Sequence, residues 1–436
     1  MSRIESWGRT PKVQHREIIE LGWRDNLPNL ESLSTSVLPF GNGRSYGDSC
    51  LNDNGILLHT TRLNHLIAID PDALLVRCES GITFSELLSV LVPRGLFVPV
   101  TPGTKMLTVG GAVANDVHGK NHHSAGTFGC HVTQLGLYRS DQQEITCSPS
   151  ENTELFHATI GGLGLTGLIT WVEFNVIRIP SAYIRQENFR FANIDEYLAT
   201  SRQHDAMFPY VVSWIDCSVR GTGLGRGIYM GGSFAAVEKG AFHEPKVRTR
   251  TLPIDMPSWF LNRATVRLFN TAFYHKQWQR HSRFTVHYNP FFYPLDAIHG
   301  WNKLYGKSGF FQYQCVLPYS TATDALHEIL NSTAKAGKAS FLAVLKNFGA
   351  MTSPGMLSFP MEGITLSMDF RNEGNATLQL MNTLDTIVRS ANGRLYPAKD
   401  ARMSKEHFFQ SYPRWDEFRA WIDPKFSSTF YRRMVE

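Results

Sequence analysis

The chain has 436 residues, of which 42% are hydrophobic and 19% charged, a balance typical of a globular protein. One hydrophobic core does not extend over this length, so we expect two domains. A net charge of +5 without a dense basic cluster argues against a nucleic-acid partner. No apolar run reaches the roughly 18 residues of a membrane span. Residues 1–20 lack the apolar core of a signal peptide, which predicts a cytoplasmic location.

The N-terminal part of the chain alternates strands, turns and a helix. Apolar, strand-like runs at 55–61, 66–81 and 96–100 are separated by Asp, Pro and Gly. Thr83 and Glu86 have the spacing of a capping box, which predicts a helix that begins at residue 84 and ends near Pro93. Strands around a helix indicate a mixed α/β region.

A glycine-rich stretch follows, at residues 102–129. It also holds three histidines and a lysine between 118 and 129. We expect loops here rather than helix or strand, because glycine suits sharp bends and close backbone approach. Residues 131–149 then read as two strands, and 151–179 as a helix, a glycine turn and a long strand.

From about residue 180 to 393 the chain is richer in aromatic residues and poorer in glycine loops. Strand-like and helix-like segments are mixed along it, which indicates a second α+β unit with an antiparallel sheet. The expected strands are 210–219, 309–318, 341–349 and 363–370, and the expected helices are 321–337 and 377–393.

Residues 256–294 combine aromatic side chains with arginine and lysine and contain no acid. Such a composition suits a membrane interface or an anionic lipid substrate. The alternative is an internally packed segment whose charges are solvated. Both interpretations stay open.

Three glycine clusters, at 41–47, 102–111 and 161–167, fall in the N-terminal region. Backbone amides from such turns could close around a long anionic ligand, for example a dinucleotide pyrophosphate. A nicotinamide-binding Rossmann motif is disfavoured, because GNGRSY lacks the third glycine at the required spacing and no helix follows it.

A metal centre is not expected. His118 and His122 have the four-residue spacing seen in helical zinc sites, but 118–129 contains no Asp or Glu to complete a ligand set. We expect His122 and His123 to fix the loop through hydrogen bonds.

Several sequence blocks together resemble one family of flavoproteins. They are GNGRSYGD (41–48), PGT and TVGGAVANDVHGKNHHSAGTFG (within 102–129), GLGLTGLI (162–169), FFQYQ (310–314), LYPAKDAR (395–402) and YPR (412–414). The chain resembles the decaprenylphosphoryl-β-D-ribose 2-oxidase family of FAD enzymes, in the vanillyl-alcohol-oxidase/PCMH superfamily, over nearly its whole length.

The resemblance implies an α+β fold with a PCMH-type FAD-binding domain and an inserted substrate domain that carries an antiparallel sheet. The FAD-binding domain would comprise residues 1–181. The substrate domain would comprise 182–393, and residues 394–436 would return to the FAD-binding domain.

The resemblance also implies which residues form the site. The substrate positions would be Trp214, Gln312, Gln314, Lys346, Ser367 and Asp369. The FAD contacts would fall within Phe40–Ser49 and beyond, at Gly41, Asn42, Gly43, Arg44, Ser45, Tyr46, Gly47, Gly103, Thr108, Val109, Gly110, Gly111, Asn115, Asp116, Val117, His118, Ile169 and Tyr396.

Two of the implied residues are candidates for catalysis. Oxidation of a secondary alcohol moves a hydride to the flavin and releases the hydroxyl proton. A lysine about 4 Å from the resulting negative charge would stabilise it by roughly 4 kcal/mol at an effective dielectric constant near 20. Lys399 is the candidate for this role or for orienting the hydroxyl, and His118 is the candidate proton acceptor.

Each of these assignments has a structural alternative. His118 could be only a structural contact of the flavin, and Lys399 a surface lysine paired with Asp400. Trp214 and Gln314 could simply pack within the sheet.

The chain departs from the wider pattern at two positions. Tyr46 stands where many superfamily members carry a histidine bonded to the flavin, as it does in the resembled family, so we expect FAD to be held non-covalently. Ser367 replaces the family's active-site cysteine, so inhibitors that trap that cysteine should fail, and the pocket and its sugar could differ.

The expected activity is oxidation of the C2 hydroxyl of a polyprenyl-phosphoryl ribofuranose, or a related glycosyl substrate, to a keto sugar. A keto-reductase partner would complete an epimerisation used in cell-envelope polysaccharide synthesis, with a quinone-type electron acceptor. A cytoplasmic location fits this substrate, either with or without peripheral contact with the inner membrane. The alternatives are an alditol- or aldonolactone-type oxidase that uses oxygen, and a flavin-binding protein without catalysis.

Overall fold

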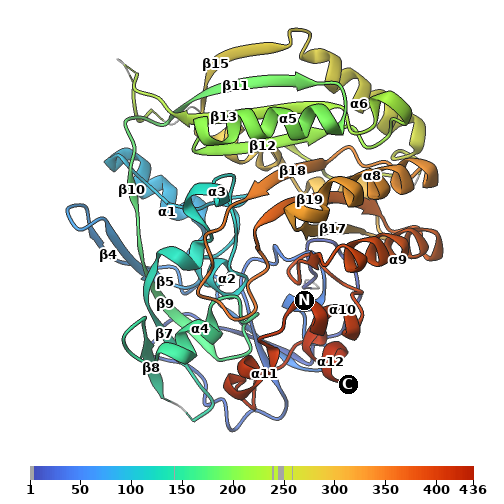
Figure 1. Cartoon of the computed structure of the whole chain (residues 1–436). Helices are drawn as coiled ribbons and strands as arrows, with labels where there is room; N and C mark the ends of the chain where they lie inside the picture. Colours follow the sequence, from blue (N-terminus) through green and yellow to red (C-terminus); the bar gives the residue numbers. More distant parts are fainter. Residues whose placement is uncertain (1–3, 142, 238–239, 244–249, 258) are drawn as a thin grey trace.

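A computed structural model of the chain describes residues 4–141, 143–237, 240–243, 250–257 and 259–436 (Figure 1). The three largest sheets among the described residues are two antiparallel sheets, of five and eight strands, and a three-stranded parallel sheet. The expected α+β class with a large antiparallel sheet is confirmed. The division into 1–181, 182–393 and 394–436 stays a prediction.

The N-terminal part contains the two smaller of these sheets. The parallel sheet has the order β1-β3-β2, and the five-stranded antiparallel sheet has the order β4-β5-β9-β7-β8. Their strands are β1 (Glu17–Glu20), β2 (Val37–Phe40), β3 (Ile56–His59), β4 (Leu66–Asp70), β5 (Leu75–Glu79), β7 (Val132–Tyr138), β8 (Glu144–Cys147) and β9 (Leu168–Asn175).

Short helices connect these strands. The expected capping box is confirmed: Thr83 accepts a hydrogen bond from Glu86 N and begins α1 (Phe84–Leu91). Helix α4 spans Thr153–Thr159, and β6 (Leu96–Phe97) pairs with β10 (Ile177–Arg178).

The expectation that 102–129 contains no helix is wrong in part. Helix α2 (Val109–Ala114) runs through the glycine pair, because the Thr108 hydroxyl caps its first turn by accepting a hydrogen bond from Gly111 N. A single turn, α3 (His122–Ala125), ends at Gly126, whose φ of +66° favours glycine.

The eight-stranded sheet forms the centre of the molecule. Its order is β15-β11-β13-β12-β18-β19-β17-β20, and every neighbouring pair is antiparallel. The strands are β11 (Tyr183–Phe191), β12 (Tyr210–Ile215), β13 (Gly227–Phe234), β15 (His281–His287), β17 (Phe310–Leu317), β18 (Ala343–Phe348), β19 (Gly363–Arg371) and β20 (Arg394–Leu395).

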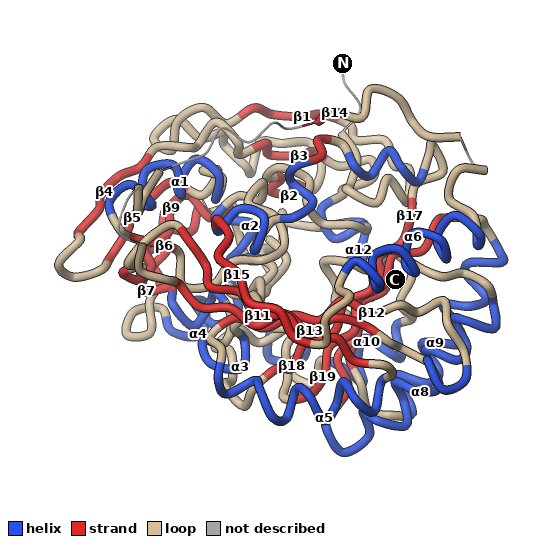
Figure 2. The backbone as a smooth tube through the Cα atoms, turned by 90° about the horizontal axis from the view of Figure 1, so that it is seen from above, coloured by secondary structure: helices blue, strands red, loops and turns tan. Residues whose placement is uncertain are grey.

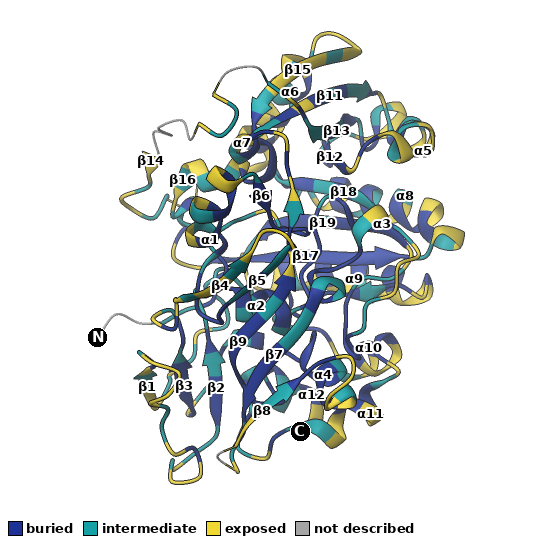
Figure 3. Cartoon of the chain, turned by 90° about the vertical axis from the view of Figure 1, so that its left-hand side faces the viewer, coloured by how far each residue is buried: buried dark blue, intermediate teal, exposed yellow. Residues whose placement is uncertain are grey.

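Three helices cover one side of this sheet, as the tube view shows (Figure 2). They are α5 (Ile194–His204), α8 (Tyr319–Ala336) and α9 (Asn375–Ser390). Strands β17 to β19 are largely buried, while the outer surfaces of the helices are exposed (Figure 3). The sheet therefore offers its other face to the N-terminal part.

The segment between β13 and β17 contributes β15 to the large sheet, at one end of the molecule (Figure 3). It contains β14 (Arg250–Thr251), α6 (Arg263–Lys276), α7 (Tyr288–Phe292) and β16 (Ile298–His299). Asn262 caps α6 by accepting hydrogen bonds from Ala264 N and Thr265 N.

The C-terminal segment returns to the first glycine turn. It contains α10 (Lys405–Ser411), α11 (Trp415–Phe418) and α12 (Thr429–Val435). Arg433, on α12, pairs with Asp48 at 2.8 Å and with Asp400 at 2.8 Å. This double ion pair connects the tail to the residues that precede β3 and fixes the backbone beside Lys399.

Candidate functional site

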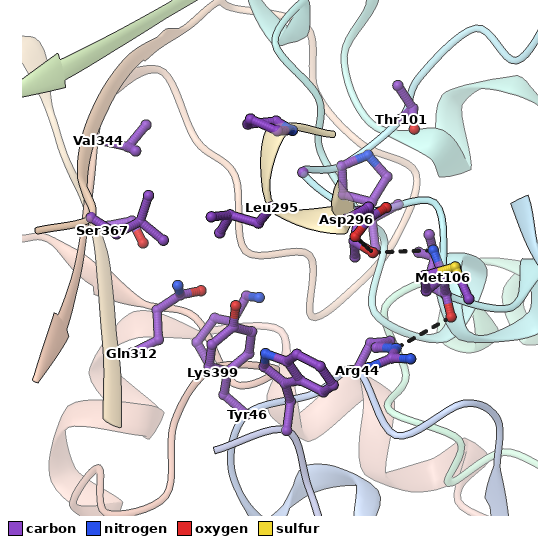
Figure 4. A pocket seen from close by; sticks show the side chains of 18 of the residues that line it. Arg44, Tyr46, Thr101, Met106, Leu295, Asp296, Gln312, Val344, Ser367 and Lys399 are labelled. Atoms are coloured by element: carbon purple, nitrogen blue, oxygen red, sulfur yellow. Dashed lines mark hydrogen bonds between the residues drawn. The ribbon is translucent and has the colours of Figure 1, made fainter. Parts of the chain in front are cut away.

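A cavity of about 1180 Å³ lies where the N-terminal glycine loops meet the eight-stranded sheet. In the close-up, Tyr46, Lys399 and Gln312 face the same space as Ser367, while Arg44, Met106 and Asp296 lie on another side (Figure 4). We call the side formed by the glycine loops the loop wall and the side formed by the strands the sheet wall. Tyr46, which lies under Lys399, is where the two walls meet. The loop wall comprises the lining residues within 41–46, 101–111 and 114–119, and the sheet wall comprises the lining residues of β17, β18 and β19 together with Lys399.

The loop wall is built mainly from backbone. A Cβ atom on Gly41 would overlap the Thr108 hydroxyl that caps α2, so the first two glycine clusters pack directly on each other. Asn42 Nδ2 donates to Met106 O at 2.7 Å and holds the turns together. Arg44 lies over the Trp7 ring at 4.3 Å, and burial lowers the pKa of its guanidinium.

The loop wall fits a large dinucleotide such as FAD. A Cβ atom on Gly103 would meet no protein atom within 4 Å, so no protein contact requires glycine there. Glycine at that position leaves space for a ligand in the cavity. The first amides of α2 are already bonded within the protein, since Val109 N donates to Ile82 O, Gly110 N to Ser80 O and Gly111 N to the Thr108 hydroxyl, so this turn offers a ligand space rather than free donors.

Most of the residues expected to contact FAD line the cavity. These are Gly41, Asn42, Gly43, Arg44, Ser45, Tyr46, Ser49, Gly103, Thr108, Gly110, Gly111, Asn115, Val117, His118, Ile169 and Tyr396. Gly47, Val109 and Asp116 do not line it, and Phe40 and Asp48 are also behind the wall.

The residues behind the wall have visible structural roles. Gly47 lies against the backbone of Asp400, which a Cβ atom would overlap. The buried Asp116 carboxylate accepts hydrogen bonds from Gly129 N at 2.9 Å and from the hydroxyls of Ser353 and Ser358. It therefore connects the glycine loop to the segment between β18 and β19.

His118 lies at the junction of the two walls. Its Nε2 is 2.9 Å from Gln314 Nε2 and its Nδ1 is 3.1 Å from Lys346 Nζ. Thr365 donates to Cys315 O and therefore accepts from Gln314 Nε2 at 3.3 Å, which fixes the amide orientation. With that orientation Gln314 donates to His118 Nε2, and Lys346 Nζ faces Nδ1, where the direction of the hydrogen bond depends on which of the two nitrogens carries the proton.

The titration of these groups agrees with that arrangement. Burial, with the nearby Lys346 cation, lowers the pKa of His118 well below its usual value, which keeps the ring neutral at pH 7. Burial lowers the pKa of Lys346 to about 7.

Lys399 differs from the other lysines of the site in its hydrogen bonding. Its Nζ lies 3.7 Å from the centroid of the Tyr46 ring, and no hydrogen bond to it is seen within the described ranges. Burial lowers its pKa to about 7, against an upward effect of Asp369 and with a further lowering by Lys346. It is not paired with Asp400, which binds Arg433 instead. The surface-lysine alternative is therefore wrong.

Asp369 lies behind the cavity rather than in its lining. It accepts hydrogen bonds from Gln312 Nε2 at 2.7 Å and from Tyr305 at 3.2 Å. Burial raises its pKa to about 7. Asp369 therefore orients Gln312 and acts on Lys399 through its charge.

The other expected substrate residues are in place. Gln312, Gln314, Lys346, Ser367 and Trp214 line the cavity. Trp214 also packs against Phe273 and donates to Phe341 O at 3.0 Å, so it combines core packing with an exposed edge in the cavity.

The two loop histidines behave differently. His123 Nε2 contacts Phe208 O at 3.0 Å, as expected for a residue that fixes the loop. His122 packs on Phe348, and both its ring nitrogens are buried without a hydrogen-bond partner among the described residues. The expectation is therefore wrong for His122, whose contribution is apolar packing.

Lys120 and Asp296 are among the lining residues that the sequence did not predict. Lys120 extends from the same motif as His118, donates to Phe291 O, and has a pKa that burial lowers to about 7. Asp296 accepts hydrogen bonds from the Thr104 hydroxyl at 2.7 Å and from Lys105 N at 2.8 Å. These bonds connect the loop wall to the segment that carries Asp296. The presence of Lys120 and Asp296 in the lining depends on long-range contacts that no local motif encodes.

The part of the cavity away from the glycine loops is mainly apolar, although Lys276, Gln277 and His299 also line the cavity. Its lining comes from the 260–304 segment and the edge of β18, and includes Phe260, Leu261, Leu295, Ile298, Leu304, Phe341 and Leu342. The cavity thus joins a polar end, with three lysines and His118, to an apolar end.

The described residues contain neither a metal-binding cluster nor a membrane-spanning helix. Among the residues that the structure places, no group of three His, Cys, Asp or Glu side chains could hold a metal ion. Over the same residues, no helix is both long and apolar enough to cross a bilayer.

Comparisons with known proteins agree with a flavin site. Residues 30–148 match a family model described as an FAD binding domain. The chain is 33% identical to the decaprenylphosphoryl-β-D-ribose oxidase of Mycolicibacterium smegmatis, over 99% of this chain and 97% of that protein. It is 30% identical to an uncharacterized protein of Streptomyces coelicolor over 81% of this chain and 100% of that protein.

A more distant similarity extends to the aldonolactone oxidases. The L-gulonolactone oxidase of Mus musculus is 25% identical over 46% of this chain and 47% of that protein. The chain is therefore an FAD-linked oxidoreductase, and it belongs to the flavoprotein family that includes decaprenylphosphoryl-β-D-ribose oxidase.

Proposed function

We propose that the protein oxidises the C2 hydroxyl of a polyprenyl-phosphoryl ribofuranose, or a closely related glycosyl lipid, to a 2-keto sugar. The observation that carries this proposal is the single cavity that joins the glycine-built wall to Lys399 and then continues into an apolar end. A sugar phosphate would occupy the cationic part, and an isoprenoid chain would occupy the apolar part. The 33% identity with the M. smegmatis enzyme supports the same substrate class.

Bound FAD supplies the acceptor for the hydride that leaves the carbinol carbon. The protein supplies the proton transfer. With a pKa near 7, Lys399 is partly neutral at physiological pH, and its Nζ then accepts the proton of the C2 hydroxyl. Its position over Tyr46 holds the amine in the cavity without a competing hydrogen bond from the described residues.

We assign His118 and Lys346 indirect roles in this proton transfer. Both nitrogens of the His118 ring already face protein groups. We therefore assign His118 to positioning Lys346 and Gln314, with proton acceptance only when one of these contacts opens. Gln312, oriented by Asp369, is assigned to bind the sugar hydroxyls.

The decisive experiment uses the visible spectrum of the purified flavoprotein. Anaerobic addition of polyprenyl-phosphoryl ribose should bleach the flavin band within seconds in a stopped-flow experiment. A spectrum that stays oxidised with this substrate, but bleaches with soluble polyols, would contradict the proposal.

The second candidate is an alditol- or aldonolactone-type oxidase that uses oxygen. The partial similarity to L-gulonolactone oxidase favours it, and so does Ser367, which departs from the cysteine of the resembled family. Stoichiometric hydrogen peroxide with a simple polyol would support this candidate. A flavoprotein that no alcohol reduces would support a binding function without catalysis.

FAD is proposed to bind non-covalently. Tyr46 occupies the position of the flavin-linked histidine of other families, and burial raises the pKa of its phenol well above the usual value, so it stays a neutral hydrogen-bonding group. Acid precipitation should leave the yellow colour in the supernatant. Colour in the protein pellet would contradict a non-covalent cofactor.

The proposed reaction also implies partners. A keto-reductase would reduce the product and give net epimerisation in cell-envelope polysaccharide synthesis, and a quinone or similar acceptor would re-oxidise the enzyme. A cytoplasmic enzyme at the inner-membrane surface fits a lipid-linked substrate. Reconstitution with a candidate reductase and a soluble quinone analogue tests both partners, since arabino product should form only when all components are present.

A further inference from the structure

Helix α6 is attached to the molecule along a narrow stripe. Only Val266, Asn270 and Tyr274 are buried among its residues. Asn270 donates to Asp216 at 3.0 Å and to Ser340 O at 3.0 Å, and Tyr274 donates to Phe191 O at 3.2 Å. These contacts fix the helix, so its outer surface has a defined orientation.

Large apolar side chains lie on the outside of this helix and its flanks. Trp278 is 76% exposed, Leu268 is 73% exposed and Trp259 is 71% exposed. Single exposed apolar residues are ordinary, but several on one segment mark an interaction surface.

Unpaired arginines accompany these apolar residues. Arg263, Arg267 and Arg280 are exposed and have no ion pair within the part of the chain that the structure describes. No Asp or Glu occurs between Asp255 and Asp296 in the sequence. We define the α6 surface as Trp259, Arg263, Arg267, Leu268, Trp278 and Arg280.

The α6 surface lies beside the apolar end of the cavity. Thr265, Phe269, Phe273 and Lys276, on one side of α6, line the cavity. Phe269 is also 49% exposed, so it belongs to both the lining and the outside. Figures 1 and 3 show α6 and β15 together at one end of the molecule, away from α11 and β8.

We propose that the α6 surface docks on an anionic phospholipid bilayer. Tryptophan and leucine side chains suit the boundary between headgroups and acyl chains, and arginines attract anionic headgroups. A second copy of the chain is a poorer occupant, because a two-fold contact would place these arginines against one another. Docking would open the apolar end of the cavity towards lipid, whichever glycosyl group the enzyme oxidises.

The test is co-sedimentation of the FAD-loaded protein with vesicles. Vesicles of phosphatidylcholine with 30% phosphatidylglycerol, in roughly the range of anionic lipid that polybasic surfaces recognise, should bind the protein, and pure phosphatidylcholine should bind it much more weakly. Arg267→Glu with Arg280→Glu should weaken partitioning by about tenfold or more. Leu268→Ser with Trp278→Ser should also weaken it, and this loss should persist at high salt.

Matched controls lie elsewhere on the surface. Arg419→Glu reverses an exposed arginine beside α11, and Trp23→Ser removes a tryptophan that is 60% exposed in the N-terminal loop. Both should bind vesicles like the unaltered protein. None of the substituted residues lines the cavity, so flavin content should be unchanged in every variant and reports correct folding.

Three results would overturn the proposal. One is no binding to the anionic vesicles at low ionic strength, and another is equal binding by the α6-surface variants and the controls. The third is a concentration-dependent dimer, seen by light scattering, that the α6-surface variants abolish, since this would assign the surface to a second copy. None of these readouts requires the sugar substrate, so the inference can fail while the proposed function holds.

Discussion

The loop wall and the sheet wall face one cavity but are built from different chemical groups of the chain. The loop wall is built mainly from backbone, with Arg44, Tyr46 and His118 as its large polar side chains, and its turns are packed so closely that Gly41 contacts the cap of α2. The sheet wall is made of long polar side chains, including Lys346 and Lys399, and Asp369 lies behind it. Burial shifts the pKa of each of these three groups to about 7.

The difference shows how the two tasks of a flavoenzyme are divided. A wall built mainly from backbone recognises a cofactor by shape, and its properties change little with pH. A wall of shifted lysines and a carboxyl changes charge within the physiological range, which suits proton transfer but makes the wall sensitive to pH. Substitutions on the two walls should therefore fail in different ways.

The largest expected effect is on the sheet wall. Lys399→Met should keep FAD but slow its reduction by substrate by roughly 10²–10⁴-fold, the usual contribution of a general base. Stopped-flow reduction and the flavin-to-protein ratio measure the two properties separately. Lys335→Met, on the exposed surface of α8, is the matched control, and an unimpaired Lys399→Met enzyme would remove the assigned role.

A loop-wall substitution should give the opposite pattern. Gly103→Val adds a side chain that meets no protein neighbour, so the fold should persist while FAD binding weakens by about tenfold, or ~1.4 kcal/mol. Gly22→Val is the control, since a Cβ there also meets no protein atom within 4 Å and Gly22 does not line the cavity. Titration of apoprotein with FAD measures the affinity. Equal affinity in both variants would contradict the assignment of FAD binding to the loop wall.

The pH dependence sharpens the sheet-wall assignment. A base acts when unprotonated, so the rate of flavin reduction should rise with pH through about 7, where the pKa of Lys399 lies. Asp369 raises that pKa and Lys346 lowers it. Asp369→Asn should therefore move the midpoint to lower pH, and Lys346→Met should move it to higher pH. Shifts in the same direction, or a rate that falls through pH 7, would contradict Lys399 as the base.

The smallest effect is expected at Ser367. It lines the cavity, and no described side chain depends on its hydroxyl through a hydrogen bond. Ser367→Cys should change the reduction rate by less than about threefold, since a serine and a cysteine differ little in size. The variant should gain covalent labelling by inhibitors that trap a cysteine, whereas the unaltered protein should show no adduct by intact mass. Labelling of both proteins would place the reactive residue elsewhere.

The sequence predicted the site better than it predicted the local structure around it. The glycine clusters, Gln312, Gln314, Lys346 and Lys399 meet at one cavity, because motif resemblance carries information on long-range packing. The helix α2 was missed, since glycine content suggested a loop and the Thr108 cap outweighs that propensity. Lys120 and Asp296 were also missed, because their contacts join segments far apart in the chain.

The burial of Asp48 and Asp400 against Arg433 has a consequence for biosynthesis. Lys399 and the residues that hold it belong to a segment that the ribosome makes after the glycine turns and the large sheet. The turns can form early, but the cavity gains its last side only when this segment has emerged and docked. We therefore expect cofactor capture to wait until residues 394–436 have docked.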